Sequence, residues 1–168
     1  MKRILLLVIG LIFSAFIIFN LYSSENKSGV GKSFSPTPEV KDVKIVKASF
    51  AIFTNNIFRI FSDPKYHFQS KDVYMEEANI IIVKTKGITW DGFFKTLPMK
   101  LTKECLTTGT GQVFCTNDSQ KLRFFINGKE DVNALAREVN QKDKLLVSFG
   151  NKTDEEIKKE LQQISTIK

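Results

Sequence analysis

The sequence predicts an α+β domain with a mixed sheet, joined to an apolar N-terminal segment. Three observations lead to this class. The first 22 residues are almost uniformly apolar, short segments rich in β-branched and aromatic residues follow between turn signals, and one amphipathic helix closes the chain. A length of 168 residues allows one domain and a short appendage. With 42% hydrophobic and 26% charged residues, the composition excludes a polytopic membrane protein and a disordered chain.

Residues 1–22 are expected to form a transmembrane signal anchor. Lys2 and Arg3 precede an apolar run, Ile4–Tyr22, whose 19 residues rise about 28 Å as a helix, close to the roughly 30 Å of a hydrocarbon core. A cleaved signal peptide is the alternative, but it needs small residues before its cleavage site, and residues 20–22 are bulky. The two positive charges place the N-terminus in the cytoplasm. The sequence therefore predicts a single-pass cell-membrane protein whose C-terminal part is extracytoplasmic.

Residues 23–43 are rich in Ser, Gly and Pro and show no apolar period, which indicates a flexible tether. The remaining residues, 44–168, form the predicted extracytoplasmic domain. Its expected extended segments are Ile45–Thr54, Ile57–Ser62, Tyr66–Glu77, Asn79–Lys86, Met99–Leu106, Gln112–Thr116, Lys121–Ile126 and Leu145–Phe149.

The first two segments flank Asn55-Asn56, a pair that suits a two-residue hairpin turn. Pairing across this turn opposes Phe53 with Phe58 and Phe50 with Phe61, so both faces of the hairpin carry aromatic rings. Each face is then either covered by other elements, which the pattern favours, or partly exposed for a partner.

Two helices are expected in the domain. Residues 88–97 begin with Thr89 as the natural N-cap and end at a proline. The closing helix has a capping box in which Glu156 reaches back to Thr153, and it carries an apolar stripe at helical spacing. Residues 131–139 form either a short helix or a loop across the sheet.

Cys105 and Cys115 are the only cysteines, and each lies five residues from a turn centred on Thr110. Such spacing places them opposite each other in a hairpin, where a disulfide can form. In an exported segment a structural disulfide is the natural interpretation. A redox pair is the alternative, but exchange-active dithiols usually occur as Cys-x-x-Cys at a helix N-terminus.

The order of elements fits a β-grasp-like, or ubiquitin-like, arrangement, and the chain resembles an uncharacterised family of membrane-anchored extracytoplasmic small proteins of archaea and small-genome bacteria. The resemblance spans about residues 45–165. It rests on the two-cysteine hairpin and on four further blocks: Phe61–Tyr66, Gly87–Phe94, Leu122–Lys129 and Phe149–Ile157.

Members of that family typically carry His-x-His pairs on early and middle strands, which implies metal binding, and some are labelled disulfide isomerases. This sequence departs from the pattern. The positions that match the three His-x-His pairs hold Lys47 and Ser49, Tyr74 and Glu76, and Ile82 and Lys84. A protonated lysine cannot replace an imidazole as a ligand. His67 is the one remaining histidine and is only a weak metal candidate. We therefore expect no cofactor and no bound metal.

A net charge of +7 indicates an acidic partner, and 14 basic against 8 acidic residues fall between positions 41 and 129. The candidate interface is a basic-aromatic surface, although the pattern favours the alternative, a merely solvated sheet face. Its residues are Lys84, Lys86, Lys121, Arg123 and Phe125. Outside the cell its partner would be another envelope protein, anionic lipid or an anionic envelope polymer rather than nucleic acid. The predicted function is a non-catalytic binding or interaction module, and the alternative is an envelope thiol-disulfide or metal-handling protein.

Overall fold

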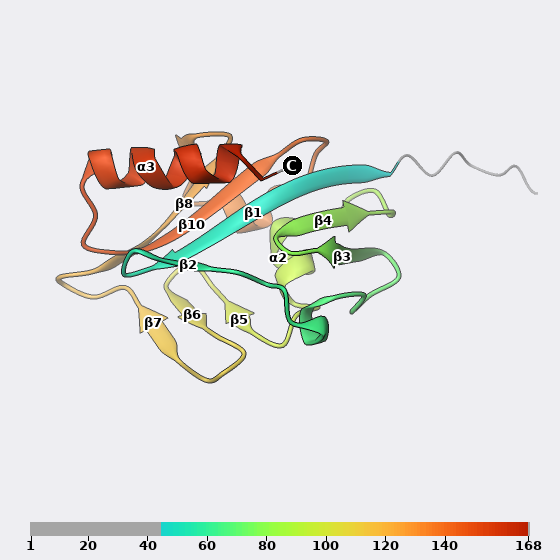
Figure 1. Cartoon of the computed structure of the whole chain (residues 1–168), viewed down its shortest axis with the longest axis horizontal. Helices are drawn as coiled ribbons and strands as arrows, with labels where there is room; N and C mark the ends of the chain where they lie inside the picture. The colour runs from blue at the N-terminus through green and yellow to red at the C-terminus, as the bar shows by residue number, and fades with distance from the viewer. Residues whose placement is uncertain (1–44, 168) are drawn as a thin grey trace, which may run out of the picture. The chain divides into compact units, whose positions relative to one another are not determined.

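The computed structural model describes residues 45–167, which form an α+β domain built around a seven-stranded mixed sheet (Figure 1). The strands of this sheet are β1 (Val46–Thr54), β2 (Ile57–Arg59), β3 (Val73–Glu77), β4 (Ile80–Val83), β8 (Lys121–Ile126), β9 (Lys129–Glu130) and β10 (Lys144–Gly150). The expected α+β class and the C-terminal helix are confirmed. The predicted signal anchor and tether, residues 1–22 and 23–43, lie outside the described residues. Within residues 45–167, no helix has the length and apolar character that crossing a bilayer requires.

The centre of the sheet is a parallel pair, β1 beside β10, with Ser49 opposite Lys144 and Thr54 opposite Phe149. On the far side of β10 follow β8 and then β9, both antiparallel to their neighbours. The other side of β1 is shared, because its first half pairs with β4 and its second half with β2. β3 completes the sheet beyond β4. β1 therefore pairs with three strands of the sheet, β10, β4 and β2.

The cysteine hairpin does not join this sheet. It forms a second, three-stranded sheet of β5 (Lys100–Leu101), β6 (Cys105–Thr107) and β7 (Val113–Cys115). The expectation of a single mixed sheet is therefore wrong. Pro98, before β5, has no backbone N–H to donate to a strand ladder, and the buried side chains of Leu101 and Leu106 pack under the main sheet instead.

The third predicted segment, Tyr66–Glu77, is extended only in its second half. A short 3₁₀ helix, η1 (Pro64–Tyr66), precedes it, because the Asp63 carboxylate accepts a hydrogen bond from Lys65 N and proline suits the first helical turn. β2 ends at Arg59, so Phe50 and Phe61 are not opposed in the ladder as predicted. Their rings still meet edge-on, with centroids 5.0 Å apart. The predicted opposition of Phe53 and Phe58 is confirmed.

Both faces of the main sheet are covered, as the aromatic pattern favoured. Alternate residues of β1 face a larger core, in which Phe50 and Ile52 pack against α2 (Trp90–Phe94), η2 (Ala134–Ala136) and the second sheet. The intervening residues, including Phe53, face α3 (Asp154–Ser165). Figure 1 shows α3 lying along one face and the second sheet and α2 on the other. The second core is closed by the α3 side chains Ile157 and Ile164.

The predicted helix caps are confirmed. Thr89 Oγ1 accepts from Gly92 N at the start of α2, although α2 is only five residues long. At α3, Thr153 Oγ1 accepts from Glu156 N, and the Glu156 carboxylate accepts from Thr153 N at 2.9 Å. This backbone hydrogen bond holds the pKa of Glu156 below its ordinary value. The described residues, 45–167, belong to one compact unit, which contains every strand pairing and hydrophobic cluster described above.

Candidate functional site

The predicted disulfide is present. Cys105 and Cys115 are directly opposed across β6 and β7, with their Cα atoms 4.1 Å apart, and their sulfur atoms are bonded. Both residues are half-buried. Cys105 lies in a strand, and its backbone N–H donates to Thr102 Oγ1, so the pair lacks the helix N-terminus that lowers the pKa of exchange-active thiols. The bridge links the two longest strands of a small sheet and favours a structural role.

A hollow of about 280 Å³ lies between β2 and the tip of the cysteine hairpin. Two of its lining side chains are large, apolar and open to solvent: Ile57 is 57% exposed and Ile60 is 64% exposed. β2 borders the hollow and pairs only with β1, so within residues 45–167 its outer edge has no strand partner. An exposed edge beside apolar side chains is a surface that soluble domains normally avoid.

The wall of the hollow depends on a close backbone approach at Gly109. A Cβ atom placed there would lie 2.5 Å from Tyr66 Oη and 2.9 Å from the carbonyl oxygen of Pro98. Only glycine therefore lets the hairpin tip rest against the Tyr66 ring, which in turn packs edge-on against Phe61 with centroids 4.9 Å apart. The shape of the hollow follows from these contacts, and sequence periodicity gave no sign of them.

The five residues of the predicted basic-aromatic surface fall into two groups. Lys84 and Lys86 follow β4, whereas Lys121, Arg123 and Phe125 belong to β8, and β1 and β10 lie between these strands. The structure does not bring the two groups together.

In the β8 group, Arg123 and Phe125 share a face as expected, with the guanidinium 5.0 Å from the ring centroid. Phe125 is buried in the core beneath α3, however, so it contributes little exposed surface. Arg123 is paired with Glu130 on β9 through two hydrogen bonds of 2.8 Å. That pairing lowers the pKa of Glu130 and raises the pKa of Arg123. Arg123 is therefore already occupied by a carboxylate.

The β4 group has aromatic neighbours that the sequence analysis did not select. Lys84 Nζ lies 4.8 Å from the centroid of the Tyr74 ring, and this contact with Tyr74 raises the pKa of Lys84. The ring of Phe68 stacks on the Tyr74 ring, with the two centroids 5.3 Å apart. Phe68 is 65% exposed. The exposed side chains of Lys84 and Phe68 thus both contact the ring of the buried Tyr74.

Further lysines lie at the same end of the sheet, where β1 begins and β4 ends. We call this group the basic end. It comprises Lys47, Lys71, Lys84, Lys86, Lys129, Lys142 and Lys144. Three of them, Lys47, Lys142 and Lys144, line a second hollow of about 310 Å³. Its apolar lining comes from Ala48, Ile80 and Ile167.

The weak metal candidate, His67, contacts its own segment. Its Nε2 lies 2.8 Å from the carbonyl oxygen of Phe61, to which it donates. Within residues 45–167 no group of three His, Cys, Asp or Glu side chains is arranged to hold a metal ion.

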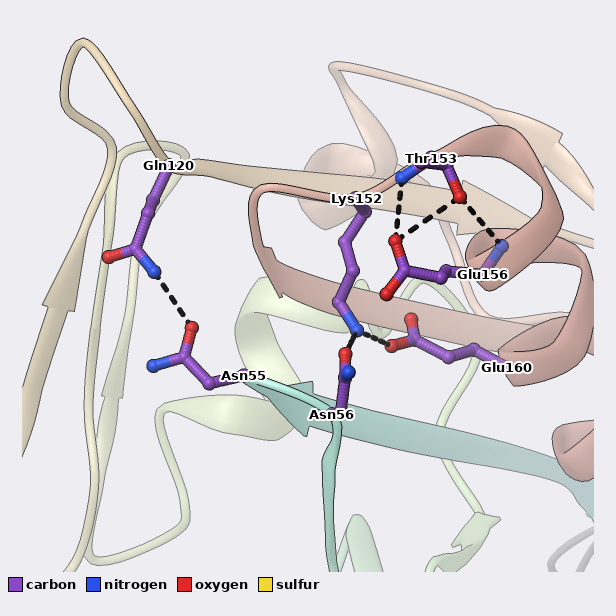
Figure 2. Close-up of polar contacts among 7 residues, drawn as sticks. All are labelled: Asn55, Asn56, Gln120, Lys152, Thr153, Glu156 and Glu160. Carbon is purple, nitrogen blue, oxygen red and sulfur yellow. Dashed lines mark hydrogen bonds and ion pairs between the residues drawn. The ribbon is translucent and has the colours of Figure 1, made fainter.

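A buried ion pair, missed by the sequence analysis, connects α3 to the β1–β2 turn (Figure 2). Lys152 Nζ lies 2.7 Å from Glu160 Oε1, and the side chains are only 3% and 6% exposed. Lys152 also donates to Asn56 Oδ1, while the neighbouring Asn55 accepts from Gln120 Nε2 at 2.9 Å. The predicted turn at these asparagines is confirmed, since both have positive φ. Through Gln120 and Lys152 the turn contacts the segments before β8 and before α3.

The comparisons with known proteins add no relative. The chain matches no protein-family model, no curated protein and no solved structure.

Proposed function

We propose that this chain is a single-pass membrane protein that displays a disulfide-bridged, β-grasp-like domain outside the membrane. There it acts as a non-catalytic module that binds an extended segment of another envelope protein. The observation that carries the proposal is the hollow beside the outer edge of β2, with Ile57 and Ile60 exposed along it.

An extended peptide fits this site for two reasons. The outer edge of β2 offers backbone N–H and C=O groups, to which a peptide can add as a further strand. The adjoining hollow, at about 280 Å³, accepts one or two apolar side chains of such a peptide. Backbone pairing would supply affinity and the hollow would supply specificity.

The fold and compartment in the proposal have separate support. The β-grasp-like assignment is supported by the parallel pairing of the first and the last strand, β1 and β10, at the centre of the sheet. A hairpin strand lies on one side of this pair and β8 on the other. The disulfide supports an oxidising compartment, and the apolar segment 1–22 supports the anchor. An anchor formed by residues 1–22 would leave the domain outside the membrane.

Site-specific photocrosslinking tests the binding role. The full chain, with a photoreactive residue at position 60, is expressed in its host, and the membranes are washed with alkaline carbonate before analysis. We expect the chain to remain in the washed membranes and to form one discrete crosslinked product. Introducing Ile57→Asp should abolish that product, because a carboxylate beside the hollow must be desolvated when a partner binds.

A photoreactive residue at Val132 is the matched control, since Val132 is 71% exposed but lies away from the hollow. Equal crosslinking from both positions, or a product that persists with Ile57→Asp, would argue against a partner at β2. Loss of the chain from the washed membranes would exclude the anchor.

The resistance of the cysteine bridge to reduction distinguishes a structural role from the alternative role in thiol-disulfide exchange. We expect Cys105 and Cys115 to resist maleimide labelling in a glutathione buffer at the mildly oxidising potential of envelope compartments. The replacement of both by alanine should lower the free energy of unfolding by about 2–3 kcal/mol, because the bridge closes a short loop. Rapid, reversible opening in glutathione would contradict the structural role and favour the redox alternative.

A further inference from the structure

The charges of the domain are unevenly distributed between the two ends of its sheet. The basic end carries seven lysines, six of them exposed and Lys144 half-buried. The other end, where α3 starts, carries both signs, with Asp118, Asp154, Glu155 and Glu156 beside Lys121, Lys158 and Lys159. Figure 1 shows β1 running from the basic end toward the start of α3. β10 spans the distance between the ends, and its seven residues rise roughly 20 Å.

Three acidic side chains near the basic end are committed to donors of the domain itself, and a fourth, the exposed Glu76, lies near Lys84 and, with Tyr74, helps to raise its pKa. Asp72 accepts from Thr85 Oγ1 at 2.7 Å, and Glu138 accepts from Gly87 N at 2.8 Å. The third, Asp143, is buried and accepts from Asn127 Nδ2 at 2.8 Å.

Three lysines of the basic end are differently placed: Lys47 and Lys142, which line the second hollow, and Lys84, which lies beside Tyr74. Within residues 45–167 none of the three forms an ion pair with a carboxylate. All three are exposed, and their ammonium groups are therefore available to an external anion. The excess positive charge at this end is a property of the surface and is not neutralised by internal pairing.

Apolar side chains lie among these lysines. Ile45, just before β1, is 55% exposed, and Phe68 is 65% exposed on its stack with Tyr74. The second hollow has Ile80 and Ile167 in its lining beside the lysines. A soluble polyanion has no apolar part to meet such side chains. The boundary between headgroups and acyl chains of a membrane offers both an anionic and an apolar layer.

We propose that the basic end docks on an anionic lipid surface and orients the domain on the membrane. This inference rests on the membrane anchoring of the proposed function, because the chain that leads from residues 1–22 joins the domain at Ile45, within this end. Docking there would leave the β2 hollow and the other end of the sheet, where α3 starts, free. Each lysine at an anionic surface contributes about a fivefold gain in affinity.

Vesicle sedimentation with residues 41–168 tests the proposal. This segment includes all the described residues and with them every strand pairing, both hydrophobic clusters and the disulfide. Because it lacks residues 1–22, its result does not depend on whether the anchor exists. The probes are vesicles of phosphatidylcholine alone and of equal parts phosphatidylcholine and phosphatidylglycerol, at low and at high salt.

Two variants with the same change in net charge are compared. The basic-end variant carries Lys47→Glu, Lys84→Glu and Lys142→Glu. The far-end variant carries Lys121→Glu, Lys158→Glu and Lys159→Glu. All six lysines are exposed, and thermal melting establishes that each variant is folded. A milder basic-end variant with glutamine at the same three positions replaces the first if that one does not melt cooperatively.

We expect binding to phosphatidylglycerol vesicles at low salt, and a loss on the order of a hundredfold in the basic-end variant. The far-end variant should keep its affinity within a few-fold, because none of its three lysines belongs to the basic end or lines the second hollow. An equal loss in both variants, equal binding to phosphatidylcholine, or no vesicle binding at all would overturn the proposal. Binding to a soluble polyanion such as heparin without binding to vesicles would overturn it as well.

Discussion

Replacing Lys152 with methionine is expected to lower the free energy of unfolding by about 3–5 kcal/mol. The ammonium group is the only partner of the Glu160 carboxylate among the described residues, and that carboxylate is 6% exposed. Its removal leaves a buried negative charge without compensation and takes a donor from Asn56. Urea denaturation of residues 41–168 at neutral pH measures the loss.

The double variant Lys152→Met with Glu160→Leu separates the charge from the packing. Because the two replacements remove both charges at similar volume, stability should return to within about 1 kcal/mol of the original chain. Lys158→Met, on the exposed face of α3, is the matched control and should change stability by less than about 0.5 kcal/mol. If Lys152→Met behaves like Lys158→Met, the pair is hydrated in solution and does not hold α3 to the β1–β2 turn.

Phe50→Ala is expected to lower the free energy of unfolding by about 3–5 kcal/mol. Phe50 is fully buried on β1, and its ring meets three others, those of Phe61, Phe93 and Phe94, at centroid distances of 5.0, 5.4 and 5.4 Å. These neighbours come from the segment after β2 and from α2. Truncation therefore leaves a cavity where the sheet and the helix meet.

Phe68→Ala is the control for Phe50→Ala, because Phe68 loses the same ring from a site that is 65% exposed. We expect a cost below about 1 kcal/mol, from the lost stack on Tyr74. Equal destabilisation by the two variants in urea titrations would show that the aromatic contacts at Phe50 do not form the centre of the core.

Features that depend on neighbouring residues were predictable from the sequence. Asn55-Asn56 forms the expected turn, Thr153 and Glu156 form the expected capping box, and the spacing from the hairpin centre to each cysteine placed the disulfide. Each of these is decided by geometry within about ten residues. The approximate positions of most strands were also predictable from β-branched and aromatic runs between turn residues. Their limits were not, since β2 ends at Arg59 and only Val73–Glu77 of the third segment is a strand, because β propensity depends on tertiary context.

Features that join distant segments were not predictable. The contact of Lys152 with Asn56 spans 96 residues, and no periodicity marks it. The same holds for the division of β1 between β4 and β2, which depends on where β2 ends. The contact of Lys84 with the Tyr74 ring was not predicted either. It depends on the register between β3 and β4, whereas the predicted basic-aromatic surface was chosen from alternation along β8.

The parallel pair at the centre of the sheet also bears on when the fold can form. Ser49 on β1 faces Lys144 on β10, so the pairing that organises the sheet closes a loop of about 95 residues. Such non-local pairing makes folding slow relative to chains of the same size with local contacts. A chain made from its N-terminus keeps β1 without its central partner until the segment up to residue 150 has emerged. If the domain crosses a membrane as proposed above, this delay would keep β1 without its central partner until the strand up to residue 150 has been synthesised.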